Sequence, residues 1–195
     1  MIRAVLILGL IALAACSRPA PDPRSQITRA QLETVTTPLL LAELTGLGTA
    51  AGVTPVSANG DVTTWQTGDG VSLSFRSGVV VATRGLGQDV LSADVENTLA
   101  ALRGAREGYY TRFHSFMDGE HQTGFRSFQC RVTARAAERI TIFDHVHATT
   151  RVDETCLSPG VQVDNSYWLG GGIMWKSKQW VGPVTGYLLT ERLVR

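Results

Sequence analysis

Residues 62–83 alternate between apolar and polar side chains and are divided by short turns that contain glycine. In segment 71–76, valine, leucine and phenylalanine alternate with serine and arginine, which is the pattern of a strand with one buried face. Gly68-Asp69-Gly70 precedes this segment and Ser77-Gly78 follows it, and both tolerate the positive φ angles of tight hairpins. Connections this short exclude parallel neighbours, whose crossovers need a dozen or more residues. The segment therefore predicts an antiparallel meander.

The rest of the chain shows the same strand and turn signals. Segments 28–36 and 94–103 have helical spacing instead, and Gly104 stands where the second helix should end. We expect further strands at 39–45, 49–57, 79–83, 109–116, 124–134, 139–150, 163–169, 173–181 and 186–193. This succession predicts a mainly β fold, an antiparallel meander that forms a sandwich or a partly open barrel, with one or two short helices.

The first fifteen residues form an apolar run with one charge, Arg3. A charged start, an apolar centre and a small-residue exit are typical of a secretory signal peptide, and the run is too short for a stable membrane span. It ends in Leu13-Ala14-Ala15-Cys16, which resembles the bacterial lipobox, in which the cysteine is acylated with chains such as palmitate. The alternative is an ordinary signal peptide that happens to contain a cysteine. We expect a lipoprotein signal peptide at 1–15 and lipidation at Cys16.

The residues after Cys16 predict where the anchor lies and how far it reaches. In the sorting rule of enteric bacteria, an aspartate after the lipidated cysteine retains the protein in the inner membrane, so Ser17 predicts the periplasmic face of the outer membrane. Pro19, Pro21 and Pro23 favour extended chain. We therefore expect a tether at 16–27, with a reach of about 30 Å, and a single β-rich domain at 28–195.

The charge balance excludes one class of partner. The chain has 18 basic and 17 acidic side chains, and loss of Arg3 with the signal peptide leaves the two signs equal. Nucleic-acid binding depends on surplus cations, so no nucleic-acid partner is expected. No later stretch is apolar for long enough to form a second membrane span.

Two cysteines remain once Cys16 is assigned to the lipid. In an oxidising compartment such a pair usually forms a bridge, so we expect a disulfide between Cys130 and Cys156. Two buried free thiols are the alternative. A catalytic thiol is not expected, because no cysteine–histidine motif is visible.

The sequence offers few residues for catalysis or metal binding. His145 and His147 share one face of an expected strand and could reach one metal ion, but a third ligand, His114 or Asp153, has no recognisable spacing. A polar strand facing solvent explains the pair equally well. No catalytic or cofactor motif is present, so we expect no enzyme activity, cofactor or metal. An enzyme would have to draw on His145, His147, Asp144 and Tyr109.

Tryptophans are candidates for binding sugars, because sugar rings stack on large flat side chains. The alternative is packing in the core or at sheet edges, where most tryptophans lie. The candidates for glycan contact are Trp65, Trp168, Trp175 and Trp180.

Two segments resemble signatures of a known family. One is 65–87, WQTGDGVSLSFRSGVVVATRGLG, and the other is 173–183, IMWKSKQWVGP, with Glu191-Arg192-Leu193 after it. Together they are similar to the group 4 capsule polysaccharide lipoproteins of the YjbF/GfcB type, over residues 36–194. The resemblance implies a mostly β outer-membrane lipoprotein that helps to make or export an exopolysaccharide or capsule. It also implies polysaccharide-export proteins, or the glycan itself, as partners. A periplasmic enzyme that modifies the polymer, or a glycan-binding module, is the alternative.

Overall fold

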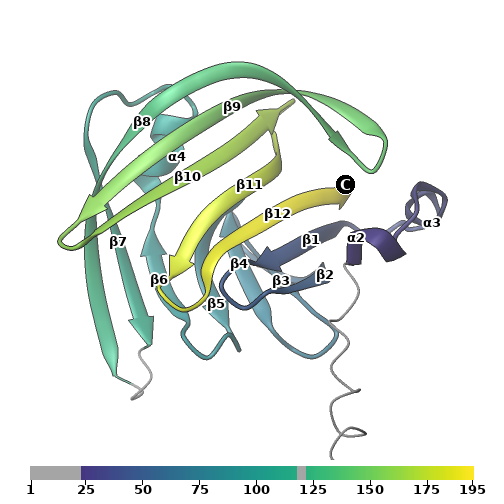
Figure 1. Cartoon of the computed structure of the whole chain (residues 1–195), viewed down its shortest axis with the longest axis horizontal. Coiled ribbons are helices and arrows are strands. Elements are labelled where there is room, and N and C mark those ends of the chain that lie inside the picture. Colours follow the sequence, from purple (N-terminus) through teal and green to yellow (C-terminus); the bar gives the residue numbers. More distant parts are fainter. Residues whose placement is uncertain (1–22, 118–121) are drawn as a thin grey trace, which may run out of the picture.

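The computed structural model describes residues 23–117 and 122–195. Within these residues the chain forms twelve antiparallel strands and short helices (Figure 1). The helices are α2 (Pro23–Gln26), α3 (Arg29–Glu33) and α4 (Glu96–Leu102). The strands are β1 (Leu39–Leu44), β2 (Thr49–Asn59), β3 (Val62–Gln66), β4 (Ser72–Arg76), β5 (Val79–Arg84), β6 (Val90–Asp94), β7 (Tyr110–Met117), β8 (Thr123–Ile142), β9 (His145–Ser158), β10 (Val161–Gly170), β11 (Ile173–Gly182) and β12 (Gly186–Val194).

The strands form one sheet in the order β5-β4-β3-β2-β1-β12-β11-β10-β9-β8-β7-β6. Pairing of β1 with β12, with Leu41 opposite Glu191, joins the first half of the meander to the second. The two outermost strands, β5 and β6, are neighbours in the chain, and Arg84 of β5 donates hydrogen bonds to the carbonyl oxygens of Val90 and Leu91. The sheet is therefore a nearly closed barrel. The expected mainly β meander is confirmed, in its barrel form.

Alternate positions of the strands fill the barrel interior. Leu73 and Phe75 of β4 are buried, as the alternation in this segment predicts. They belong to one apolar cluster with Val53 of β2 and Leu188 of β12. Side chains from both halves of the meander thus meet inside, and their removal from water stabilises the closed form.

Helix α4 packs against this interior. Leu99 and Leu102 contact an apolar cluster that includes Tyr167 of β10. The C-terminal end of the helix is held by Arg135 of β8, whose guanidinium donates to the carbonyl oxygens of Ala101 at 2.8 Å and Leu102 at 3.1 Å. The expected helix at 94–103 is confirmed.

A second apolar layer lies outside the barrel, over β1, β11 and β12. Leu40 belongs to the interior cluster, whereas its neighbour Leu41 belongs to the outer one. Leu32 of α3 and Ile142, at the tip of the β8–β9 hairpin, pack with Leu193 in this outer cluster. Figure 1 shows the hairpin arching over the C-terminal end of β12. Helix α3 and the hairpin tip therefore build a covered recess beside one end of the barrel.

The last residues of the expected tether contact the barrel domain. Residues 23–27 were expected to be extended tether, but Arg24 pairs with Glu43 of β1 at 2.6 Å and Ile27 packs on the outer cluster. Helix α3, expected within 28–36, begins with a capping box in which Thr28 and Gln31 bond each other's backbone N–H.

Residues 1–22, with the expected signal peptide, the Cys16 anchor and most of the tether, lie outside the described residues. In the part of the chain that is described, no helix has the length and apolar character needed to cross a membrane.

The expected strand at 139–150 is wrong. Phe143 and Asp144 have φ angles of 44° and 67° and form the turn between β8 and β9. The segment therefore contains a hairpin turn, and β8 runs without a break from 123 to 142. Strand β6 was not expected.

The expected disulfide is confirmed. Cys130 of β8 and Cys156 of β9 lie opposite each other in the sheet and are bonded, with an S–S distance of 2.05 Å. Both side chains are buried in an apolar cluster with Tyr110, Phe128 and Trp180.

Candidate functional site

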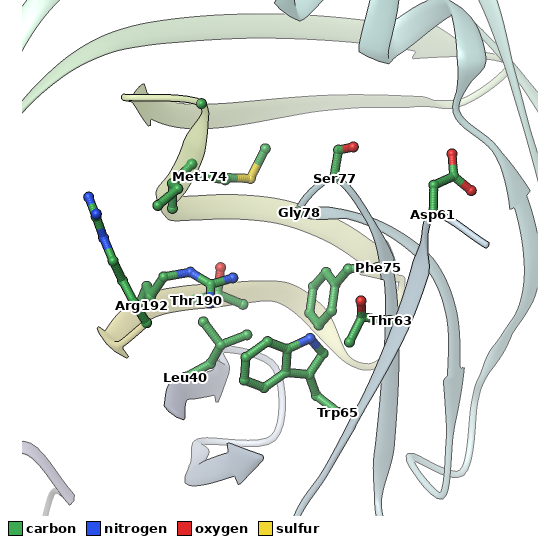
Figure 2. Close-up of a pocket in the computed structure, with 13 residues that line it drawn as sticks. Leu40, Asp61, Thr63, Trp65, Phe75, Ser77, Gly78, Met174, Thr190 and Arg192 are labelled. Carbon is green, nitrogen blue, oxygen red and sulfur yellow. The ribbon is translucent and has the colours of Figure 1, made fainter. Parts of the chain in front are cut away.

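A cavity with a volume of about 550 Å³ lies at one end of the barrel. It is called the mouth cavity below. Trp65 of β3 and Phe75 of β4 face it because both occupy inward positions of their strands. Arg192 and Thr190 of β12 face it from the opposite side (Figure 2). The turn at Ser77-Gly78 and residues 172–174 complete its wall.

Arg192 is one of three charged residues that line this cavity, with Asp61 and Arg195. Its guanidinium carbon lies 5.2 Å from the centre of the Trp65 ring, a distance at which a cation is attracted to an aromatic face. Its Nε is buried and has no hydrogen-bond partner. Burial, together with the neighbouring Arg195, lowers the pKa of Arg192, but an arginine side chain stays protonated in proteins. The mouth cavity therefore combines an aromatic wall with an unsatisfied cationic donor.

A second cavity of about 480 Å³ adjoins the first, under α3 and the hairpin tip, and is called the side cavity below. Arg192 and Arg195 line both cavities. The side cavity adds Arg29 of α3 and Trp175 of β11. The Trp175 ring is stacked by His147 at 3.7 Å and lies 4.7 Å from the guanidinium carbon of Arg195. The ring of Trp175 is thus already covered by the side chains of His147 and Arg195.

The four candidate tryptophans do not converge. Trp65 and Trp175 line the two adjoining cavities. Trp180 packs in the interior against His114 and other rings. Trp168 belongs to the outer apolar cluster, with the charged groups of Arg151 and Lys176 over its ring. All four side chains are at most 8% exposed and belong to apolar clusters, so core packing fits each of them. Trp65 and Trp175 remain in the candidate site because they also line the two cavities.

The histidines do not form the metal site that the sequence left open. His145 and His147 are neighbours on β9, with ring centroids 6.3 Å apart. His114 lies inside the barrel and is bonded to Arg112, and Asp153 is bonded to Arg151 and Ser166. Neither proposed third ligand is available to the pair.

Among residues 23–117 and 122–195, one other set of potential metal ligands lies close together: Cys130, Glu154 and Cys156. The two sulfur atoms are bonded to each other, and the carboxylate accepts hydrogen bonds from several side chains. No free ligand remains in this set.

The candidates for an enzyme are also dispersed. Asp144 lies in the hairpin turn, next to His145. Tyr109 immediately precedes β7, and the first residue of β7 pairs with Cys130 of β8. Cys130 lies twelve positions along β8 from Ile142, which is at the hairpin tip beside His145. That separation is about 40 Å of strand. Asp144 and the histidines therefore have no access to Tyr109.

Sequence reasoning missed a polar network inside the barrel. Its centre is Glu154 of β9, which is buried between Val152 and Cys156 on the inward face. Five side chains donate to its carboxylate: Thr98 (3.2 Å), Tyr110 (2.6 Å), Arg112 (3.3 Å), Asn165 (2.8 Å) and Tyr167 (2.9 Å). Burial and the carboxylate raise the pKa of both tyrosine hydroxyls, which keeps them as neutral donors. The signal available in the sequence was an acidic residue, Glu154, at an inward position of a strand, which indicates buried polar partners.

His114 makes the stability of the protein depend on pH. Nε2 of its buried ring accepts a hydrogen bond from Nε of Arg112 at 2.8 Å, so this nitrogen carries no proton. Burial, and then the Arg112 charge, lower the pKa of His114 well below 6.5. Below about pH 6.5 the unfolded chain therefore binds more protons than the folded one, and we expect the free energy of unfolding to fall as the pH drops, by at most about 1.4 kcal/mol per pH unit for one group.

Denaturant unfolding between about pH 7.5 and pH 5 measures this slope. His114→Gln, whose amide oxygen can still accept from Arg112, should flatten it. An equal slope in the wild type and in His114→Gln would show that another group is responsible.

Comparison with known proteins gives the fold and the family. The family described as group 4 capsule polysaccharide lipoprotein gfcB, YjbF, matches residues 10–193. The crystal structure of the hypothetical lipoprotein YmcC from Escherichia coli (K12) is similar, with a TM-score of 0.71 and 17% sequence identity over 92% of this chain and 98% of that one. No curated protein matches the sequence.

The family match covers almost the whole chain, including both segments on which the resemblance was based. The resemblance is therefore confirmed. YmcC, which is also described as a lipoprotein, has a similar fold. A sequence identity of 17% supports similarity of the fold and nothing more. The chain belongs to the YjbF family of group 4 capsule polysaccharide lipoproteins.

Proposed function

We propose that this protein is a non-enzymatic accessory in the production or export of a capsule or exopolysaccharide, anchored by Cys16 to the periplasmic face of the outer membrane. Its role is to hold the glycan at the mouth cavity, or to pass it to polysaccharide-export proteins. The observation that supports this most is the pairing of Trp65 with Arg192 in an open cavity. The family supplies the link to capsule polysaccharide.

The mouth cavity has the composition of a sugar site. Its volume lies in the range of known small-ligand pockets, which combine apolar walls with a few polar groups. Trp65 and Phe75 provide the apolar wall. Thr63, Thr190 and Arg192 provide hydroxyl and guanidinium groups that can bond to sugar hydroxyls.

A binding role fits the arrangement of polar groups better than catalysis does. General acid–base chemistry needs a titratable group within hydrogen-bond reach of the reacting atoms. The one carboxylate on the mouth cavity, Asp61, is paired with Arg76 at 3.1 Å. His147 of the side cavity is stacked on Trp175. These groups are engaged in structural contacts.

Deletion and complementation of the gene test this proposal. We expect deletion to reduce surface polysaccharide under conditions that induce its synthesis, and the wild-type gene to restore it. Cys16→Ala should fail to restore it, because the exported protein has no acyl chain, whereas Ser17→Ala should succeed. Mass spectrometry of the N-terminal peptide and fractionation of the envelope report the anchor directly. Unchanged polymer in the deletion strain, or an unmodified Cys16 thiol, would overturn the proposal.

A further inference from the structure

Three arginines surround the mouth and side cavities: Arg29, Arg192 and Arg195. Arg192 and Arg195 form no ion pair with any residue in 23–117 or 122–195. Arg29 has one partner, Glu33, on its own helix. The carboxylates that line the cavities, Asp61 and Glu33, pair with Arg76 and Arg29. Among the described residues, the charges of Arg192 and Arg195 are therefore left without a carboxylate partner.

Neighbouring groups respond to this charge. Arg195 contributes to the lowered pKa of Arg192, and Arg195 and Arg29 both contribute to the lowered pKa of His147. In each case burial is the larger cause. Like charges that share a partly desolvated site repel each other, so this arrangement of arginines is electrostatically unfavourable. An anion bound between the arginines would remove this repulsion.

The position of the cations distinguishes the type of anion. Arg192 is half-buried, lies over the Trp65 ring and has its Nε without a partner (Figure 2). Guanidinium groups bind carboxylate, sulfate and phosphate through paired, charge-assisted hydrogen bonds. A flat bilayer surface requires exposed cations, whereas Arg192 is half-buried in a recess with an aromatic wall. An acidic group carried on a sugar fits both the charge and the wall.

We infer that the mouth and side cavities form one binding site for an acidic glycan, in which Arg192 and Arg195 hold an anionic substituent and the sugar that bears it packs against Trp65. This inference rests on the proposed function, and it adds the chemical class of the polymer. Arg192 lies between the cavities, so the acidic group binds at their junction. The glycan chain extends from this junction into either cavity.

Binding measured by intrinsic tryptophan fluorescence, on the full lipoprotein in detergent, tests the inference. The probes are oligogalacturonate and dextran sulfate, with carboxyl-reduced oligogalacturonate and dextran as their neutral counterparts. We expect the acidic probes to bind at least about tenfold more tightly than the neutral ones. Arg192→Gln and Arg195→Gln should each weaken the acidic probes by a similar factor. Lys178→Gln is the matched control, because this lysine lies over Tyr187 and lines neither cavity.

The outcomes separate the inference from the proposed function. Equal binding of acidic and neutral probes, weakened by Trp65→Ala, would overturn the acidic preference and leave glycan binding intact. Binding of neither class would overturn both. Arginine-dependent binding to phosphatidylglycerol vesicles, without binding of the acidic glycans, would assign the site to lipid headgroups instead. Arg195 is exposed at the end of β12, so Arg195→Gln remains informative if Arg192→Gln does not fold.

Discussion

Replacement of Glu154 by alanine is expected to lower the free energy of unfolding by about 3–5 kcal/mol. The Arg112–Glu154 ion pair is almost completely buried, so removal of the carboxylate leaves the guanidinium charged in the interior without its partner. The hydroxyls of Tyr110 and Tyr167 and the amide of Asn165 also lose an acceptor, and unsatisfied buried polar groups add to the cost. Denaturant unfolding of the purified variant measures the loss.

Glu138→Ala is the matched control for this prediction. Glu138 lies on the adjacent strand β8 and pairs with Arg151 at 3.7 Å, but both side chains are partly exposed, at 39% and 42%. Exposed pairs contribute about 0–1 kcal/mol, so this variant should unfold close to the wild type. A double replacement of Glu154 and Arg112 by apolar residues should recover part of the loss, because it removes the unpaired charge. An equal, small effect of Glu154→Ala and Glu138→Ala would contradict a structural role for the network.

The local strand pattern could be predicted from the sequence because it depends on near neighbours. The inward positions of Leu73 and Phe75 and the helix at α4 follow from spacing alone. Closure of the barrel depends instead on the pairing of β1 with β12, which brings Leu41 opposite Glu191. Nothing in either segment by itself specifies the other. The sequence therefore left the sandwich and the barrel as alternatives.

The error at the β8–β9 hairpin has a local cause. Phe143 adopts φ > 0, which is uncommon for a large side chain, so the turn lacks the glycine signal on which hairpin prediction depends. Phe143 also packs against the outer apolar cluster, and this contact favours the turn in the folded protein. A tertiary contact thus determines a turn that its own residue types disfavour.

The candidate site was only half visible in the sequence. Trp65 and Trp175 were candidates because the residue type itself suggests sugar contact. Arg192 and Arg195 were not, because a chain with 18 basic and 17 acidic side chains is neutral on average. The fold concentrates Arg29 from α3 with these two arginines around adjoining cavities. A whole-chain charge balance does not report such a local excess.

Removal of the Cys130–Cys156 bridge is expected to lower the free energy of unfolding by about 3.5 kcal/mol, the loop-entropy value for the 26 positions that it closes. The measurement compares denaturant unfolding with and without reductant, alongside the double variant Cys130→Ala/Cys156→Ala. Reductant should destabilise the wild type and leave the double variant unchanged. Wild type that resists denaturant equally with and without reductant, with both thiols shown to be free, would contradict a stabilising role.

The bridge and the Glu154 network should not act independently. The sulfur atoms and the Glu154 carboxylate lie within 4.8 Å of one another, and neighbours this close are generally coupled. The triple variant Glu154→Ala/Cys130→Ala/Cys156→Ala should therefore lose less stability than the two separate losses added together, because the cavity left by the sulfurs allows water to reach Arg112. Strict additivity would show that the two features stabilise β9 separately.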